Sequence, residues 1–177
     1  MFLLKYKILD FDSVIKHRDD DFIEIEGLLE ITFNDKKYGD YPIDETNGSY
    51  ADSLIIIWIE SLLKSIVMLN EHTTIYIKDI EVYDNWIRLV RIDGQIYVNI
   101  VHAKPLCGDF FVTEHALDIV GIEWSNDETI DWNEYKREIL LKSKMLLDDL
   151  TQANKSLIYN KRLREINNII EQIIVTK

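Results

Sequence analysis

The chain has 177 residues, of which 47% are hydrophobic, and its formal net charge at pH 7 is −12. This length is typical of one domain, and this apolar content argues against a disordered chain. Residues 1–130 hold 11 Lys and Arg against 25 Asp and Glu, a charge of −14, whereas residues 131–177 carry +2. Such an acidic body repels nucleic acid and anionic membranes and attracts a basic partner, although acidity also serves solubility alone.

Strands are predicted in the first quarter of the chain. Alternating apolar residues over Phe2–Ile8 and Ile23–Phe33 favour two strands, each with one wet face. Gly27 falls on the apolar face of the second strand, where it indicates a bend or close packing. Asn34–Lys37 is a turn, and Tyr38–Pro42 is a short return strand. The expected wet face of the second strand carries Glu24, Glu26, Glu30 and Thr32.

A buried helix is predicted over about residues 49–70. Ser49 and Asp52 resemble a capping box, and the apolar run Leu54–Leu69 follows them. That run is interrupted by charged residues and is shorter than the ~20 apolar residues that span a bilayer. We therefore expect the central helix of a core, not a membrane segment.

The expected location is the cytoplasm. The stretch MFLLKYKILDFD at the N-terminus lacks the continuous apolar segment of a signal peptide. Cys107 is the single cysteine, so no internal disulfide forms, which agrees with a reducing compartment.

An antiparallel meander is predicted over about residues 74–102. The pair Asp93–Gly94 favours a two-residue type I′ hairpin, because glycine tolerates the positive φ that this turn needs. This hairpin places Arg88 opposite Asn99. The apolar parity changes upstream, so we expect a bulge or break at Lys78–Asp79.

Asp84–Asn85 is predicted to be the preceding turn of the meander. In that register Glu81 lies opposite Arg88, a favourable charge pair, and Tyr83 lies opposite Trp86. Both turns then agree on one aliphatic core face. Its residues are Ile80, Val82, Ile87, Leu89, Ile96, Val98 and Ile100.

The other face of the meander supplies candidate partner-binding residues. Tryptophan, tyrosine and arginine carry much of the binding energy of protein interfaces. A covering helix that makes this face a second core is the alternative, and both interpretations stay open. The candidates are Glu81, Tyr83, Trp86, Arg88, Tyr97 and Asn99, joined by Asp19, Asp20 and Asp21 of an acidic connector.

The fold class follows from the order of the elements. Residues 109–113 predict a further strand and residues 121–132 an acidic, aromatic loop. Helical periodicity over residues 131–175 predicts two amphipathic helices in a hairpin. Strands, a helix, strands and two helices together indicate an α+β fold with a mainly antiparallel sheet. We expect one domain, with an acidic body over residues 1–130 and the C-terminal helical hairpin (131–177) packed on it.

Motifs for chemistry are absent from the sequence. It has no phosphate-binding loop, no dinucleotide-binding loop and no nucleophile elbow. The histidines lack zinc-site spacing, so we predict no metal, no cofactor and no catalytic residue. Two enzymatic alternatives stay open: carboxylates within Asp10–Glu26 as a hydrolytic or magnesium site, and Cys107 with His102.

Three stretches carry a family resemblance: NDKKYGDYP, DIEVYDNWIRLVRI and WNEYKREILLKSKMLLDD. In composition and layout they resemble small acidic immunity proteins of bacterial polymorphic and contact-dependent toxin systems. The resemblance implies a non-enzymatic inhibitor that binds one cognate toxin, expected to be basic, and blocks its active site. It carries over no individual residue.

Two other functions stay open beside this interpretation. One is an enzyme of unrecognised type, which would use the carboxylates or the Cys–His pair named above. The other is a homo-oligomeric structural protein, such as a homodimer, assembled through the C-terminal helices. Nucleic acid and membranes are not expected as partners.

Overall fold

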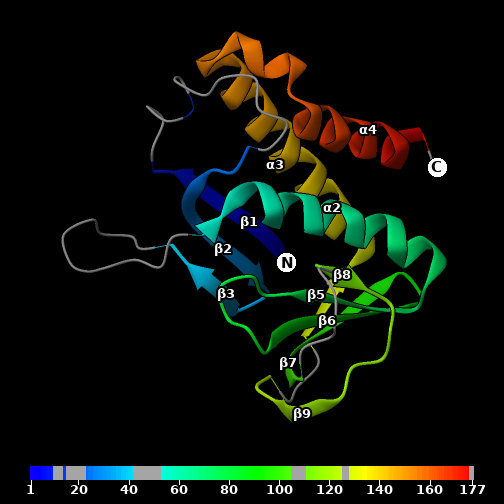
Figure 1. Cartoon of the computed structure of the whole chain (residues 1–177). Coiled ribbons are helices and arrows are strands. Elements are labelled where there is room, and N and C mark those ends of the chain that lie inside the picture. The colour runs from blue at the N-terminus through cyan, green and yellow to red at the C-terminus, as the bar shows by residue number, and fades with distance from the viewer. Residues whose placement is uncertain (10–13, 15–22, 42–52, 105–110, 125–127, 176–177) are drawn as a thin grey trace.

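The computed structural model describes residues 1–9, 14, 23–41, 53–104, 111–124 and 128–175. In these parts of the chain, two antiparallel sheets and three α-helices form the α+β fold that the sequence predicts (Figure 1). The C-terminal helical hairpin is confirmed. The helices are α2 (Ile55–Glu71), α3 (Trp132–Ala153) and α4 (Lys161–Val175), and the 3₁₀-helix η1 (Lys155–Tyr159) joins the last two.

The first sheet consists of β1 (Phe2–Ile8), β2 (Glu26–Phe33), β3 (Lys36–Asp40) and the two-residue β4 (Ser53–Leu54). β1 pairs with one edge of β2, and β3 and β4 share the other edge. The expected wet face of β2 is wrong at Thr32 and at Glu30, both of which are buried. The carboxylate of Glu30 accepts hydrogen bonds from Lys5 Nζ at 3.1 Å and from Lys37 Nζ at 3.0 Å. Two lysines from the flanking strands therefore neutralise its charge.

The second sheet contains the meander. Its strand order is β10-β7-β6-β5-β8, and β9 pairs with β7. β9 and β10 pair with different parts of β7 along the same edge. The strands are β5 (Thr74–Lys78), β6 (Asn85–Ile92), β7 (Gln95–Ala103), β8 (Val112–Thr113), β9 (Ile119–Ile122) and β10 (Glu128–Asp131).

The hairpin between β6 and β7 has the predicted register. Arg88 pairs with Asn99, and Trp86 pairs with Val101. The two residues of the Asp93–Gly94 turn have φ values of 49° and 79°, as a type I′ turn requires. This part of the prediction is confirmed.

The predicted turn at Asp84–Asn85 is wrong. Six residues, Asp79–Asp84, connect β5 to β6, and Tyr76 rather than Glu81 lies opposite Arg88. The physical reason is Asp79: its Oδ1 accepts the backbone N–H groups of Glu81 at 2.8 Å and Val82 at 3.0 Å. This side chain closes a local turn and ends the strand at Lys78.

Two consequences follow for the predicted pairs and the predicted core. The Tyr83–Trp86 pair does not form, because Lys78 lies opposite Trp86. Ile75 and Ile77 take the core positions expected for Ile80 and Val82, and Val82 is 44% exposed. The other five residues of the predicted core face are fully buried, namely Ile87, Leu89, Ile96, Val98 and Ile100.

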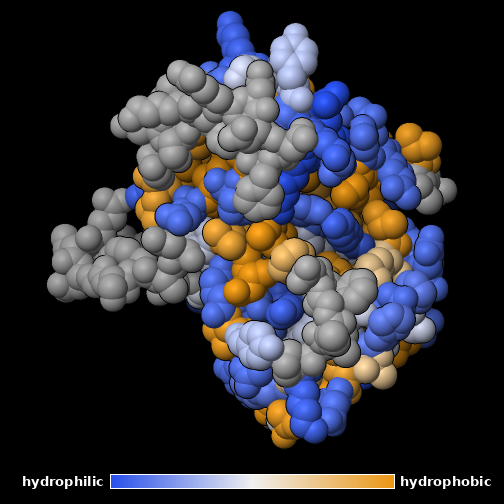
Figure 2. All heavy atoms as spheres, in the orientation of Figure 1, coloured by the Kyte–Doolittle hydropathy of each residue, from blue (hydrophilic) through white to orange (hydrophobic). Residues whose placement is uncertain are grey.

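Residues 121–132 are not the continuous loop that the sequence predicts. They include the end of β9, all of β10 and the first residue of α3. β9 exposes apolar side chains, and Figure 2 shows hydrophobic surface at the lower tip of the molecule, where Figure 1 places this strand. The exposed residues are Ile119, Val120 and Ile122.

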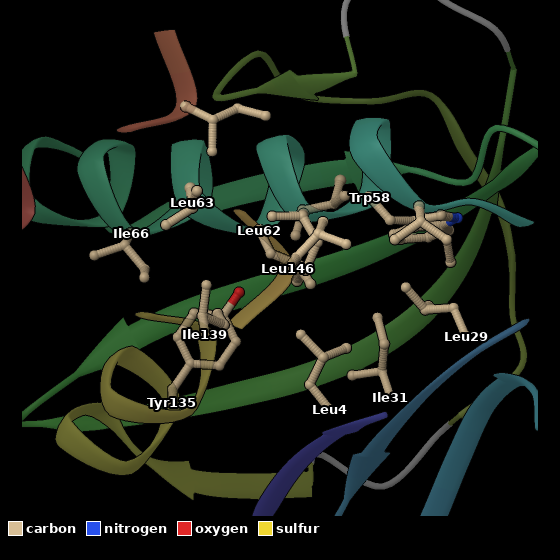
Figure 3. Close-up of a cluster of buried hydrophobic side chains, with 14 of the residues drawn as sticks. Leu4, Leu29, Ile31, Trp58, Leu62, Leu63, Ile66, Tyr135, Ile139 and Leu146 are labelled. Atoms are coloured by element: carbon tan, nitrogen blue, oxygen red, sulfur yellow. The ribbon is translucent and has the colours of Figure 1, made fainter. Parts of the chain in front are cut away.

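The core surrounds α2. One buried cluster draws on both sheets and on α2, α3 and α4. In Figure 3, Leu62 and Ile66 of α2 lie above Leu4 of β1 and Tyr135 of α3. Tyr135 also forms a buried hydrogen bond with Ser65, with 2.7 Å between the two hydroxyl oxygens. α2 begins later than predicted, and the proposed capping residues Ser49 and Asp52 lie outside the described residues.

Gly27 marks close packing, as the sequence predicts. A Cβ at this position would lie 2.4 Å from the Lys7 carbonyl oxygen and 2.8 Å from Ile55 Cγ1. We expect Gly27→Ala to lower the free energy of unfolding by about 1–3 kcal/mol, because β1 or α2 must shift. Gly121→Ala is the matched control, since a Cβ at that position would lie 3.4 Å from its nearest neighbour, His102 Cδ2. Urea denaturation of both variants tests the contact, and equal losses would contradict it.

Candidate functional site

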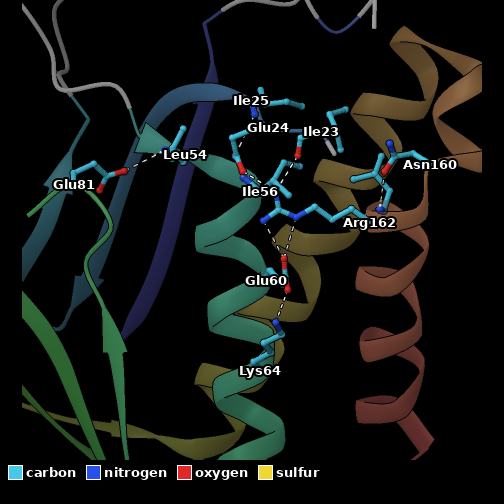
Figure 4. A network of polar contacts seen from close by, with 11 residues as sticks. Ile23, Glu24, Ile25, Leu54, Ile56, Glu60, Lys64, Glu81, Asn160 and Arg162 are labelled. Atoms are coloured by element: carbon cyan, nitrogen blue, oxygen red, sulfur yellow. Dashed lines mark hydrogen bonds and ion pairs between the residues drawn. The ribbon is translucent and has the colours of Figure 1, made fainter. Parts of the chain in front are cut away.

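The start of α2 is stabilised by carboxylates from elsewhere in the chain. Its N-cap residue, Leu54, has no capping side chain, and its first turn has no acidic residue. Instead, Glu81 Oε1 accepts the Leu54 N–H at 3.1 Å, and Glu24 Oε1 accepts the Ile56 N–H at 3.1 Å. The Ile55 N–H donates to the carbonyl of Ile25 at 3.0 Å. Two negative groups therefore face the positive end of the helix dipole (Figure 4).

Arg162 connects α4 to the same point. It reaches from α4 toward α2 in Figure 4, and Nη1 donates to Glu24 Oε2 at 2.9 Å and to the Ile23 carbonyl at 3.0 Å. Nε and Nη2 both donate to Glu60 Oε2 at 3.1 Å. Burial raises the pKa of Glu24, and the arginine opposes that rise. These charges are mutually paired, so we interpret this network as structural.

Glu81 also lines an open pocket with a volume of about 400 Å³. The pocket lies between β3, the 79–84 connection and the chain just after β9. Lys37 also lines the pocket, but its ammonium group is paired with Glu30. We name it the carboxylate pocket after the residues that characterise its walls: Tyr38, Asp79, Glu81, Asn85, Glu123 and Trp124.

Tyr38 and Asp79 hold the pocket wall together. The Tyr38 hydroxyl donates to Asp79 Oδ2, while Asp79 Oδ1 holds the backbone of the 79–84 connection. Burial, followed by the negative charge of Asp79, raises the pKa of Tyr38 far above its ordinary value, so the hydroxyl stays protonated. Its ring lies 6.3 Å from that of Trp124 and 6.2 Å from that of Trp58, measured between centroids.

The carboxyl group of Glu81 has a strongly raised pKa. Glu81 as a whole is exposed to solvent, but both oxygens of its carboxylate accept the Trp58 Nε1–H, at 3.2 and 3.1 Å. Burial of the carboxylate raises its pKa to about 7, and the nearby charge of Asp79 adds to the rise. The hydrogen bonds from Trp58 and from the Leu54 N–H act in the opposite direction. This group therefore exchanges a proton near neutral pH, and a nearby cation would favour its charged form.

The predicted partner-binding residues are divided between two places. Glu81 lies in the carboxylate pocket, and Tyr83, 69% exposed, lies in the same connection with Lys78 Nζ 5.4 Å from its ring centroid. Trp86 lies on the sheet face and is only 1% exposed. Asp19, Asp20 and Asp21 lie outside the described residues.

The remaining candidates share the face of Trp86. Arg88 Nη1 donates to Asn99 Oδ1 at 3.3 Å, and Asn99 Nδ2 donates to the Trp124 carbonyl at 3.3 Å. Tyr97 is half-buried beside them. Trp86 is covered by its own sheet and by the segment after β8, in a cluster separate from the C-terminal helices. The other members of this cluster are Tyr76, Val101, Ala103 and Leu117.

Sequence reasoning missed most of the pocket. Tyr38, Asp79, Glu123 and Trp124 come from three separate parts of the chain. The acidic, aromatic composition of residues 121–132 was the one available signal, and composition does not show which distant residues meet. No periodicity in the sequence relates Trp124 to Tyr38.

The enzymatic alternatives find limited geometric support. Cys107 lies outside the described residues, and His102 Nδ1 has Asp84 Oδ2 at 4.0 Å. Glu24 is occupied by Arg162 and the start of α2. Among the described residues, no three His, Cys, Asp or Glu side chains lie close enough together to hold a metal ion.

Known proteins offer no counterpart for this site. No protein-family model matches this chain, and no curated protein or solved structure is significantly similar to it. None of the described helices has the length and apolar character needed to cross a membrane.

Replacing each of two buried tryptophans by phenylalanine tests the indole–carboxylate bond. Trp58 and Trp86 are 2% and 1% exposed, so both changes remove the same atoms from a packed interior. Trp86 Nε1 has no hydrogen-bond partner among the described residues, whereas Trp58 Nε1 donates to Glu81. We expect Trp58→Phe to lower the free energy of unfolding by about 1–2 kcal/mol more than Trp86→Phe. Urea denaturation measures both, and equal losses would show that the bond contributes nothing.

The pKa of Glu81 predicts a pH dependence of stability. The folded protein holds this proton more tightly than the unfolded chain, because the pKa rises from 4.5 to about 7 on folding. The resulting stabilisation is present below about pH 4.5 and is lost as the pH rises through about 7. We expect Glu81→Gln to reduce the fall in Tm between about pH 5 and about pH 8. The control is Glu71→Gln at the exposed other end of α2, and an equal effect there would contradict the assignment.

Proposed function

We propose that this protein is a non-enzymatic binding protein that neutralises a basic protein by direct contact. The carboxylate pocket carries this proposal. Three acidic side chains, Asp79, Glu81 and Glu123, line it beside the rings of Tyr38 and Trp124, which pack edge to face against each other. They lie in the part of the sequence that carries a charge of −14. Such a surface attracts a positively charged protein and speeds the encounter.

The edge of the pocket adds a second element of a binding surface. Val82 and Tyr83 follow Glu81 in the 79–84 connection and are 44% and 69% exposed. An exposed tyrosine buries a large area with little loss of side-chain freedom, so it is well suited to an interface. Charged groups that orient the partner and a neighbouring aromatic anchor together support a protein ligand.

The resemblance to immunity proteins suggests the kind of partner. A toxin domain that acts on nucleic acid carries basic residues that normally contact phosphates. Clustered carboxylates would occupy those basic residues in place of the phosphates. We therefore propose a cognate toxin of this chemistry as the bound protein, with the acidic half of the chain covering its active site.

Acid–base catalysis is the second candidate, and the near-neutral pKa of Glu81 is the observation that favours it. The hydrogen bonds of this carboxylate argue against it. Both oxygens accept a hydrogen bond from the Trp58 indole N–H, and one of them also accepts a hydrogen bond from the Leu54 backbone N–H. A carboxylate that caps a buried helix in this way is constrained to a structural or electrostatic role.

Co-expression with the product of the adjacent gene tests the proposal. We expect a one-to-one complex that suppresses the toxicity of that product and associates more slowly as salt is added. Glu123→Lys should slow association by about tenfold, because it reverses a charge at the pocket. Glu165→Lys on α4 makes the same charge change on another part of the surface and is the control. A neighbouring product that neither binds nor is toxic would refute this function.

A further inference from the structure

We infer that the carboxylate pocket receives one lysine or arginine side chain of the bound protein. This inference rests on the proposed function for the identity of the partner, but not for the chemistry of the pocket. The volume of about 400 Å³ lies near the lower end of ligand sites, which span roughly 300–1,000 Å³. It suits a single long side chain better than a folded element.

The ion pairs of the described residues set this pocket apart. Glu24, Glu30 and Glu60 lie partly or fully inside the structure, and each has a lysine or arginine partner. None of the described basic side chains forms an ion pair with Asp79, Glu81 or Glu123. Basic side chains thus neutralise Glu24, Glu30 and Glu60, whereas Asp79, Glu81 and Glu123 have no cation among the described residues.

Asn85 gives an independent observation in the same place. It lines the pocket, its Oδ1 is shielded from solvent, and that atom accepts no hydrogen bond from the described residues. Buried acceptors without donors are uncommon, and each calls for a physical explanation. A ligand that brings several N–H donors would supply one after a small side-chain movement. Ammonium and guanidinium groups have donors only, which matches walls rich in acceptors.

The aromatic walls favour the same chemistry. The Tyr38 and Trp124 rings line the same pocket as the carboxylates, and a cation is attracted to the face of such a ring. Trp124 already has one cation of this chain beside its ring, because Lys36 Nζ lies 5.3 Å from the ring centroid, so a ligand cation would add to this contact. The apolar stem of lysine or arginine would pack on the rings while its charged end meets the carboxylates.

Binding of a cation is coupled to protonation of Glu81. The other charged groups that line the pocket are Asp79, Glu123 and Lys37, and Lys37 is paired with Glu30. The hydroxyl of Tyr38 stays protonated, and the group that α2 presents, the Trp58 indole, does not titrate. An arriving cation favours charged Glu81, so its affinity should increase as the pH rises through about 7.

Small probes test the pocket on the whole protein. The probes are N-acetyl-lysine N-methylamide, N-acetyl-arginine N-methylamide and the uncharged norleucine analogue, with the Trp58 and Trp124 indole signals followed by NMR. We expect a cationic probe to bind, to shift both signals and to bind more tightly at about pH 8 than at about pH 6, while the norleucine analogue does not. Glu81→Gln should remove the pH dependence.

Glu123→Gln provides the decisive variant. Glu123 is exposed and makes no ion pair among the described residues, so its replacement should leave the fold intact. We expect about tenfold weaker binding of the cationic probe, against no change for Glu171→Gln on α4. Equal binding of the norleucine analogue, or unchanged binding by Glu123→Gln, would overturn the inference.

Binding to the protein partner separates this inference from the proposed function. If the adjacent gene product binds the native chain and Glu123→Gln equally well, the inference fails and the proposed function stands. If the cationic probe binds but that gene product does not, the pocket assignment stands and the proposed function fails. If Glu123→Gln weakens binding of both the cationic probe and the adjacent gene product, and Glu171→Gln weakens neither, the result supports the pocket assignment and the proposed function together.

Discussion

The start of α2 depends on carboxylates that the helix itself does not carry. Its first residues are apolar on nearly every side because they enter the centre of the core, so no polar cap fits among them. Unpaired backbone N–H groups in such a place would cost free energy. Glu24, from the segment before β2, and Glu81, from the 79–84 connection, supply the acceptors instead. Through Arg162, α4 joins the same point, so both sheets and two helices depend on it.

This arrangement explains why the carboxylate pocket is where it is. Glu81 must reach the end of α2, and Asp79 shapes the turn that lets it do so. Two acidic groups are thereby brought together beside Tyr38 and Trp124. Burial, and then the neighbouring charge of Asp79, raises the pKa of Glu81, and the chain supplies no ion-pair partner for either carboxylate among its described residues. The helix cap and the functional candidate thus use the same side chain.

The sequence predicted local features of the fold well and distant contacts poorly. The β6–β7 register followed from Asp93–Gly94, because a two-residue turn leaves only one alignment of the flanking strands. The preceding connection was mispredicted because the Asp79 side chain bonds the backbone and outweighs the turn preference of Asp84–Asn85. The role of Glu81 depends on Leu54, in another element, and no periodicity encodes that contact.

The candidate site was predictable only in part for the same reason. Strand alternation correctly placed Trp86 and Arg88 on the face opposite the aliphatic core, but alternation does not show what covers a face. Trp86 is covered, whereas Glu81 and Tyr83 lie in the connection rather than on the sheet. Composition alone marked the chain as acidic. The structure adds that Asp79, Glu81 and Glu123 have no ion-pair partner among the described residues, and we propose that this local excess of carboxylates, more than the net charge, selects a cationic partner.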